Sequence, residues 1–224
     1  MPLVFNGKKI YIDSIDSACF LDNPRLGFTS KRDFTERKEA VKSICLHTRM
    51  GVWPQKVVPE VKNRRWDEVG VQRGSADDRT ASWHISIDAD GSFVCHLDLI
   101  TIQAYHASQT NPYSIGIEMY QELDGTITEA TLQTCVAICE AITSELCIKR
   151  QYPSSDKIMQ EFARPDGSWH KYRKRAYMKG GKSGKEYSGV FGHRNATRNR
   201  GRGDPGDIIF ERLAQVGYTQ VDLA

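Results

Sequence analysis

Two histidines far apart in the sequence stand in matching local contexts. His47 follows the apolar run at 44–46, and His193 follows the run at 189–192. Runs of this length are typical of central strands, so we expect each histidine at a strand tip that enters a cleft. A catalytic zinc ion takes about three protein ligands and keeps one position for water. The pair is therefore a candidate for two zinc ligands, although each histidine taken singly also fits a hydrogen-bonded structural role.

Asp204 is the candidate for a third ligand, and it also has a simpler explanation. It immediately precedes Pro205, and an aspartate at this place is well suited to cap a helix. The two roles can coexist, because a carboxylate has two oxygen atoms. Two neutral imidazoles and one carboxylate leave Zn²⁺ with a net charge of about +1, which lowers the pKa of its water from about 15.7 toward about 7.

Glu118 is the candidate for proton transfer. It stands near the end of a buried-type strand predicted over 114–119. Beside a metal site its carboxylate would be partly desolvated, and it could carry a proton from the attacking water to a leaving amine. A surface ion pair at a strand end is the alternative explanation, and the local sequence does not separate the two.

The first half of the chain predicts strands and one helix. Asn-Gly at 6–7 stands between two short apolar runs and predicts an opening β-hairpin. The charged, proline-free residues 30–41 predict a helix that Ser30 caps, with Phe34 and Val41 on its inner side.

The remaining elements mix strands with helices. Alternating residues over 83–97 predict a second hairpin, and helical spacing over 126–146 follows a Thr-x-x-Glu capping box that begins at Thr126. A last helix is predicted over 205–216, and its inward residues are Ile208, Ile209 and Leu213. We therefore expect an α/β fold, a central mixed β-sheet flanked by helices.

The totals fit one domain with additions. The chain has 224 residues, of which 39% are hydrophobic and 26% charged, enough for one substantial core. We predict a single domain over 1–224, with the hairpin and helix of 1–43 as an N-terminal extension and 149–188 as an insertion. The net charge of +3 is too small to indicate a nucleic-acid-binding protein. The six cysteines form no CxxC pair and lie mostly in apolar runs, which is typical of buried thiols.

The inserted segment has an unusual composition. Seven basic residues and no acidic residue lie between Lys171 and Lys185, and tyrosines are interleaved with them. A loop of this length usually has a function of its own. The same pattern is typical of single-stranded nucleic-acid binding, an alternative that leaves His47, Glu118 and His193 unexplained.

The ordered motifs of the chain resemble those of the zinc-dependent N-acetylmuramoyl-L-alanine amidases of type 2, a group that includes phage lysins, muropeptide-recycling amidases and peptidoglycan recognition proteins. The motifs are LHT at 46–48, SWHISIDADG at 82–91, YHAS at 105–108, Asn111 with SIGIE at 114–118, GH at 192–193 and DPG at 204–206. Each motif is weak alone, but their order is specific. The resemblance covers about 44–216, with gaps near 50–80 and 149–188.

The resemblance implies a function and a set of residues. It implies hydrolysis of the amide between N-acetylmuramic acid and L-alanine in bacterial peptidoglycan, with Zn²⁺ bound by His47, His193 and Asp204 and with Glu118 as the catalytic carboxylate. It implies a mixed sheet with helices around it and a mainly structural His84. The substrate-binding residues that it implies are Thr48, Trp83, His106 and Asn111.

One position departs from the family pattern. Many family enzymes have a lysine two residues before the third ligand, and this chain has Arg202 there. Arginine stays charged and could stabilise an oxyanion, so Arg202 is predicted as a catalytic residue, but it cannot exchange a proton. Slower catalysis follows if the family lysine transfers a proton.

The biological setting has three alternatives. No window approaches about eighteen apolar residues, and the N-terminus has no secretory signal, so we expect synthesis in the cytoplasm and no membrane span. An endolysin that reaches the cell wall after release fits these features, and so does a cytoplasmic recycling amidase. A peptidoglycan-binding protein without activity is the third alternative. We expect a monomer that does not bind nucleic acid.

Overall fold

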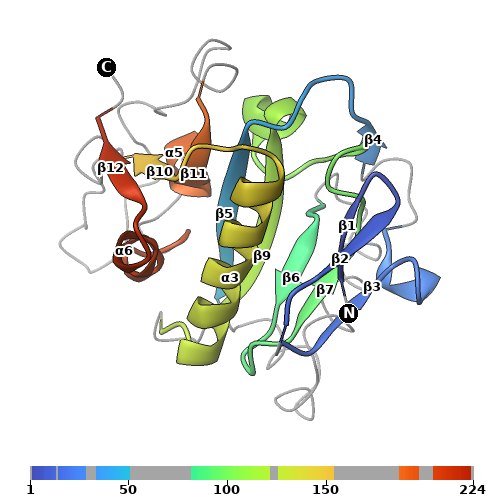
Figure 1. The fold of residues 1–224 in the computed structure, drawn as a ribbon, viewed down its shortest axis with the longest axis horizontal. Helices are drawn as coiled ribbons and strands as arrows, with labels where there is room; N and C mark the ends of the chain where they lie inside the picture. The colour runs from blue at the N-terminus through green and yellow to red at the C-terminus, as the bar shows by residue number, and fades with distance from the viewer. Residues whose placement is uncertain are drawn as a thin grey trace, which may run out of the picture.

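A computed structural model describes residues 2–13, 15–28, 34–50, 82–121, 126–153, 187–196 and 204–222. At its centre is a six-stranded mixed sheet with the strand order β11-β5-β9-β6-β7-β3 (Figure 1). The four strands from β11 to β6 are parallel, β7 is antiparallel to β6, and β3 is parallel to β7. Their bounds are β3 Ser17–Cys19, β5 Ser43–Met50, β6 Ile85–Ile87, β7 Phe93–Cys95, β9 Ser114–Gln121 and β11 Gly189–Gly192.

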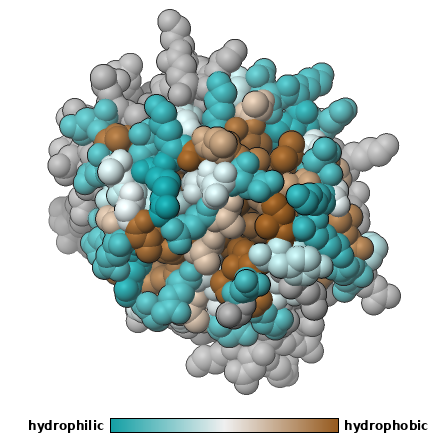
Figure 2. Space-filling model, in the orientation of Figure 1, coloured by the Kyte–Doolittle hydropathy of each residue, from teal (hydrophilic) through white to brown (hydrophobic). Residues whose placement is uncertain are grey.

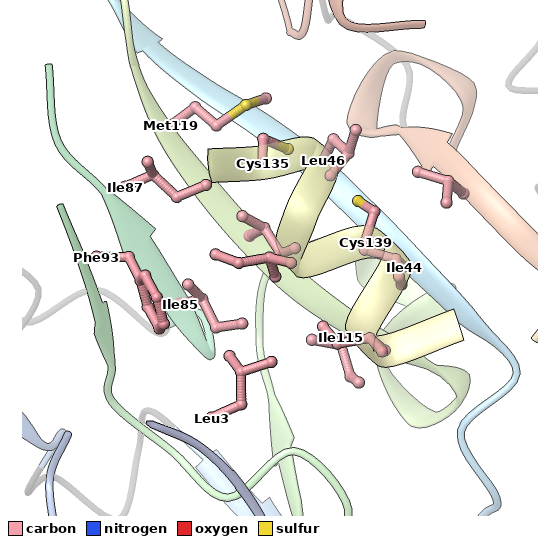
Figure 3. Packing of buried hydrophobic residues seen from close by; sticks show 14 of the residues in the cluster. Leu3, Ile44, Leu46, Ile85, Ile87, Phe93, Ile115, Met119, Cys135 and Cys139 are labelled. Atoms are coloured by element: carbon pink, nitrogen blue, oxygen red, sulfur yellow. The ribbon is translucent and has the colours of Figure 1, made fainter. Parts of the chain in front are cut away.

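The two faces of this sheet have different chemistry. Successive strand residues point to opposite faces, so Ile44 and Leu46 share one face of β5, and Cys45 and His47 share the other. Ile44 and Leu46 belong to the main hydrophobic core, which α3 (Glu129–Glu145) covers (Figure 3). The other face carries most of the residues with catalytic potential.

The α3 helix is confirmed, but its cap differs from the prediction. Thr128, not Thr126, is the N-cap residue, and its side chain accepts a hydrogen bond from the backbone N of Thr131. Cys135 and Cys139 lie on the buried face of the helix, toward the sheet (Figure 3). Among the described residues, no helix is both long and apolar enough to cross a membrane.

The predicted hairpins are also confirmed. Strands β1 (Pro2–Phe5) and β2 (Lys8–Tyr11) pair through a turn in which Asn6 and Gly7 have φ angles of 48° and 74°. Both angles are positive, as a tight hairpin turn requires. The β6–β7 hairpin turns at Gly91, whose φ is 83°.

The predicted helix over 30–41 is wrong. Residues 29–33, which include the expected cap Ser30, lie outside the described residues. Phe34–Glu36 form strand β4, which pairs antiparallel with β8 (Ile102–Ala104). Pairing with a strand almost seventy residues away overrides the local preference for helix.

Short elements complete the fold. They are the 3₁₀ helices η1 (Pro24–Leu26) and η3 (Ser108–Tyr113), the parallel strands β10 (Gln151–Pro153) and β12 (Thr219–Val221), and the helices α5 (His193–Ala196) and α6 (Ile208–Gln215). The last helix is shorter than predicted: Ile209 and Leu213 are buried, but Ile208 is 39% exposed. Most of the segment 149–188, which we predicted to be an insertion, lies outside the described residues, and so does its basic part.

Polar side chains cover most of the surface in Figure 2, with hydrophobic ones interspersed near the centre of that face. The described cysteines are all free thiols, and every one except Cys147 is buried. The prediction of mostly buried thiols is confirmed.

His96 is buried in its neutral form within the fold. Its Nδ1 donates to the carbonyl oxygen of Leu26, and its Nε2 accepts from Ser86 Oγ at 2.7 Å. The Ser86 hydroxyl also accepts from the Trp83 indole N–H at 2.7 Å. Burial lowers the pKa of His96 to about 4.

This burial predicts acid sensitivity. The unfolded chain binds a proton at His96 near pH 6.5, whereas the fold does not until about pH 4, so stability is lost as pH falls through this range. Between about pH 7.5 and about pH 5, the free energy of unfolding of the parent protein should fall because His96 becomes charged only in the unfolded chain. We expect this fall to be about 2 kcal/mol smaller in His96→Gln. Urea unfolding with a chelator present measures this difference, and an unchanged pH dependence would contradict it.

Candidate metal centre

Three residues from separate segments meet at one end of the sheet. His47 lies on β5, His193 follows β11 directly, and Asp204 precedes α6. Because β11 and β5 are parallel, with Gly192 opposite Leu46, the next residue of each strand path brings His193 beside His47. The two imidazole centroids are 4.4 Å apart. One ligand atom from each of the three residues falls within 4.8 Å of the others.

The donor set and its spacing fit a zinc ion. Asp204 Oδ2 is 3.2 Å from His193 Nδ1, and Asp204 Oδ1 is 3.9 Å from His47 Nδ1. Two ligands of a tetrahedral zinc ion at ordinary bond lengths are roughly 3.3 Å apart. Both histidines are 4% exposed and Asp204 is 9% exposed, so the donors are withdrawn from bulk water. Two imidazoles and one carboxylate match the ligand set of a catalytic zinc site.

The helix-cap explanation of Asp204 is excluded. Helix α6 begins at Ile208, and its N-cap position is Asp207. The Asp204 carboxylate instead accepts a hydrogen bond from the backbone N of Thr48, at 3.1 Å from Oδ1. This bond fixes the direction of the carboxylate beside the two histidines.

Arg194 connects the segments that carry two of the three candidate ligands. Its backbone N donates to the carbonyl oxygen of Asp204 at 3.0 Å. Its guanidinium donates to the carboxylate of Asp207 and lies 5.2 Å from the ring centroid of Phe210. Since Arg194 directly follows His193 and is 1% exposed, it forms a rigid link between His193 and Asp204.

Glu118 stands next to His47 in the sheet. The register of the parallel strands β5 and β9 pairs His47 with Glu118. Paired residues of neighbouring strands lie about 4.8 Å apart and point to the same face. Glu118 is 7% exposed, so a carboxylate is held in a largely desolvated place beside the histidines.

A sequence model of the family described as N-acetylmuramoyl-L-alanine amidase matches residues 37–207. This match covers most of the chain, and it includes His47, Glu118, His193 and Asp204. The chain belongs to this amidase family. No curated protein sequence matches it.

Solved structures extend the comparison to the fold of the amidase family. The ectodomain complex of peptidoglycan recognition proteins LCa and LCx with tracheal cytotoxin is similar at a TM-score of 0.52 and 12% identity, over 92% of this chain and 98% of that chain. A selenomethionine derivative of AmpD gives 0.49 and 16%, over 91% and 96%. The endolysin amidase LysCS from Clostridium intestinale URNW gives 0.48 and 12%, over 91% and 97%. The first of these likenesses confirms the predicted α/β fold.

Two of the four substrate residues that the resemblance implied lie beside the three candidate ligands. The backbone N of Thr48 bonds to Asp204, as described above, and Nδ1 of His106 is 3.1 Å from Nε2 of His47. Burial, followed by the charges of His193 and Arg37, lowers the pKa of His106 to about 3. The His106 ring is therefore neutral.

The other two have structural roles. Asn111 Oδ1 accepts hydrogen bonds from the backbone N of His106 and of Ala107, at 3.1 and 2.6 Å. Trp83 is 2% exposed and packs against Phe28 in a small hydrophobic cluster. Its indole therefore has little exposed surface, and a role of Trp83 in a substrate groove stays a prediction. Arg202 lies outside the described residues.

The sequence analysis missed Arg37, which lies in the charged run interpreted as a helix. Its guanidinium donates to the carbonyl oxygens of Ile102, Asn111, Pro112 and Ser114 and contacts Nε2 of His84 at 3.1 Å. Desolvation lowers its pKa to about 10, so the charge remains at neutral pH. Burial and the neighbouring Arg37 hold the pKa of His84 well below its usual value, which agrees with its predicted structural role. No local pattern distinguishes Arg37 from its exposed neighbours.

The link through Arg194 predicts an effect on metal affinity. We expect Arg194→Met to weaken Zn²⁺ binding by about 10-fold, since the guanidinium link from the His193 segment to Asp207, three residues after Asp204, is lost while the backbone bond to Asp204 remains. Competition with a chromophoric chelator measures this affinity.

Arg212→Met is the matched control. In the parent protein the Arg212 guanidinium pairs with Glu129 at 2.6 Å and joins α6 to α3, and among the described residues it makes no hydrogen bond to His193 or Asp204. Equal losses of affinity in the two variants would show that Arg194 contributes only general stability.

Proposed function

We propose that this protein is a zinc-dependent amidase that hydrolyses the bond between the lactyl group of N-acetylmuramic acid and the L-alanine of the stem peptide in bacterial peptidoglycan. The observation that carries the proposal is the convergence of His47, His193 and Asp204, with Glu118 in register beside His47. Membership of the amidase family supports the bond and the substrate class.

The chemistry follows from these residues. When bound, a zinc ion supplies Lewis acidity, which lowers the pKa of a water from about 15.7 to about 7 and polarises the amide carbonyl. The Glu118 carboxylate accepts a proton from the attacking water as the new C–O bond forms. It then gives that proton to the amine nitrogen as the C–N bond breaks, so the products are a lactyl carboxylate and a free L-alanine amino group.

The surroundings of these residues favour this proton transfer. Glu118 is largely shielded from solvent, and desolvation raises the basicity of a carboxylate. The Thr48 amide holds the Asp204 carboxylate toward the histidines, so no reorientation is needed when the metal binds. Arg202, if it lies at the site, would stabilise developing negative charge without exchanging a proton.

A peptidoglycan-binding role without catalysis is the second candidate, because one similar structure is a complex of recognition proteins. The presence of all three metal-binding side chains together with a buried carboxylate favours catalysis. A binding protein needs neither the metal nor Glu118.

Metal analysis combined with mass spectrometry of muropeptides tests the enzyme. We expect one zinc per chain and new L-alanine amino termini from purified sacculi. His193→Ala should lose both the metal and turnover. Glu118→Gln should keep the metal while turnover falls by about 10²–10⁴-fold. Unchanged turnover in either variant would refute the assigned roles. Absence of zinc from the purified parent protein would refute the proposed zinc dependence.

We further propose an endolysin role, in which the protein is made in the cytoplasm and acts on the cell wall after release. The basic stretch from Lys171 to Lys185 supports it, because cell-wall polymers are anionic and attract a cationic segment. A recycling amidase for small fragments has no need for such a segment.

Deletion of 171–185 separates the two roles. We expect binding to sacculi to weaken by at least about 10-fold at low salt, because polymer attraction is electrostatic and screened by ions. Cleavage of a small muropeptide should change little. Equal losses on both substrates would contradict the endolysin assignment.

A further inference from the structure

His47 belongs to two groups that could hold a metal. One is His47 with His193 and Asp204, and the other is His47 with Cys45 and His106. A neutral imidazole has one nitrogen with a free lone pair and one nitrogen that carries a proton. Which nitrogen of His47 carries the proton therefore decides which group can bind an ion.

The hydrogen bonds behind His106 determine this proton. Ser114 Oγ donates to the carbonyl oxygen of Thr110 at 2.8 Å, which uses the only proton of the hydroxyl. His106 Nε2 lies 3.4 Å from the same Oγ, so Nε2 must be the donor of that contact. The opposite tautomer of His106 would place two lone pairs against each other.

The tautomer of His106 in turn determines the tautomer of His47. With its proton on Nε2, His106 presents a bare Nδ1, and His47 Nε2 donates to it at 3.1 Å. The lone pair of the His47 ring is then on Nδ1, which lies 3.9 Å from Asp204 Oδ1. We propose that His106 is a positioning residue that fixes the tautomer of His47 and so makes Nδ1 the metal-binding atom. This inference rests on the proposed zinc function.

The fold holds the His106 ring in place for this task. The ring lies directly over Gly116, where a Cβ atom would come within 2.7 Å of it. Asn111 Oδ1 accepts from the backbone N of His106, and Arg37 donates to the carbonyl oxygen of Asn111 at 3.2 Å. Any side chain larger than hydrogen at position 116 would displace the ring from His47.

The inference has two consequences for ligand binding. The group with Cys45 is not a metal site in this state, because the shared proton occupies the His47 and His106 nitrogens that it would need. His106 also acts through His47 instead of serving only as a groove surface for substrate. A groove residue would alter KM and leave metal affinity unchanged.

The direct test needs no substitution. In the metal-free protein with ¹⁵N-labelled histidine, the ring nitrogen shifts of His47 should report a proton on Nε2 and none on Nδ1. A proton on Nδ1 would overturn the inference. This result does not depend on zinc binding, so it stands apart from the proposed function.

Two variants test the effect on the metal. We expect His106→Phe, which has no acceptor, to weaken Zn²⁺ binding by about 10- to 100-fold. His106→Gln, whose Oε1 can accept from His47, should stay within about threefold of the parent. His96→Gln removes a buried histidine with no bond to His47, so the Zn²⁺ affinity should not change, and this variant is the matched control.

The outcomes separate the two proposals. Unchanged Zn²⁺ affinity in His106→Phe, with only a higher KM, would overturn the positioning role and leave the zinc amidase intact. A parent protein that binds no zinc would refute the proposed function, while the histidine shifts would still decide the tautomer. Circular dichroism of each variant establishes that a loss of affinity is not a loss of fold.

Discussion

The site depends on the register of three parallel strands. Strand β5 lies between β9 and β11, so His47 has Glu118 on one side and His193 at the end of the other neighbour. A slip of one residue would turn His47 toward α3 and bring Leu46 to the reactive face. Ile44 and Leu46 prevent this slip, because moving either side chain from the core into water would cost about 1.5–3 kcal/mol. Packing of the hydrophobic face of the sheet thus holds His47 and Glu118 in position on the opposite face.

The polar face is stabilised in a different way. Many of its buried groups form hydrogen bonds with one another, and burial lowers the pKa of His84 and of His106, so both rings are neutral. Arg37 keeps its charge, but it is surrounded by the carbonyl oxygens of Ile102 in β8, Pro112 in η3 and Ser114 in β9. Since each of these hydrogen bonds has a fixed donor and acceptor, the network fixes the orientation of the side chains in addition to stabilising the fold. A metal-binding histidine needs such direction, because only one of its nitrogens can bind the ion.

The third candidate ligand comes from a loop and not from the sheet. The structure compensates with several contacts around the loop end. The Thr48 amide holds the Asp204 carboxylate, and the backbone N of Arg194 holds the Asp204 carbonyl. The Arg194 guanidinium then reaches the first turn of α6 through Asp207. These contacts fix the position of Asp204 as firmly as strand pairing fixes the position of a ligand on the sheet.

The sequence by itself determined the strands that carry His47 and precede His193, the α3 helix, both hairpins and, through ordered motifs, the family, but His47 lies within β5 and not at its tip as predicted. These features follow from local patterns, since alternation, helical spacing and turn residues act over a few positions. The tertiary structure decided the rest: the strand in place of a helix at Phe34–Glu36, the burial of Trp83, and the position of Asp204 beside the two histidines and not at the N-cap of α6. Each of these depends on contacts between residues distant in the chain, and strand pairing and burial are settled only when those distant segments meet.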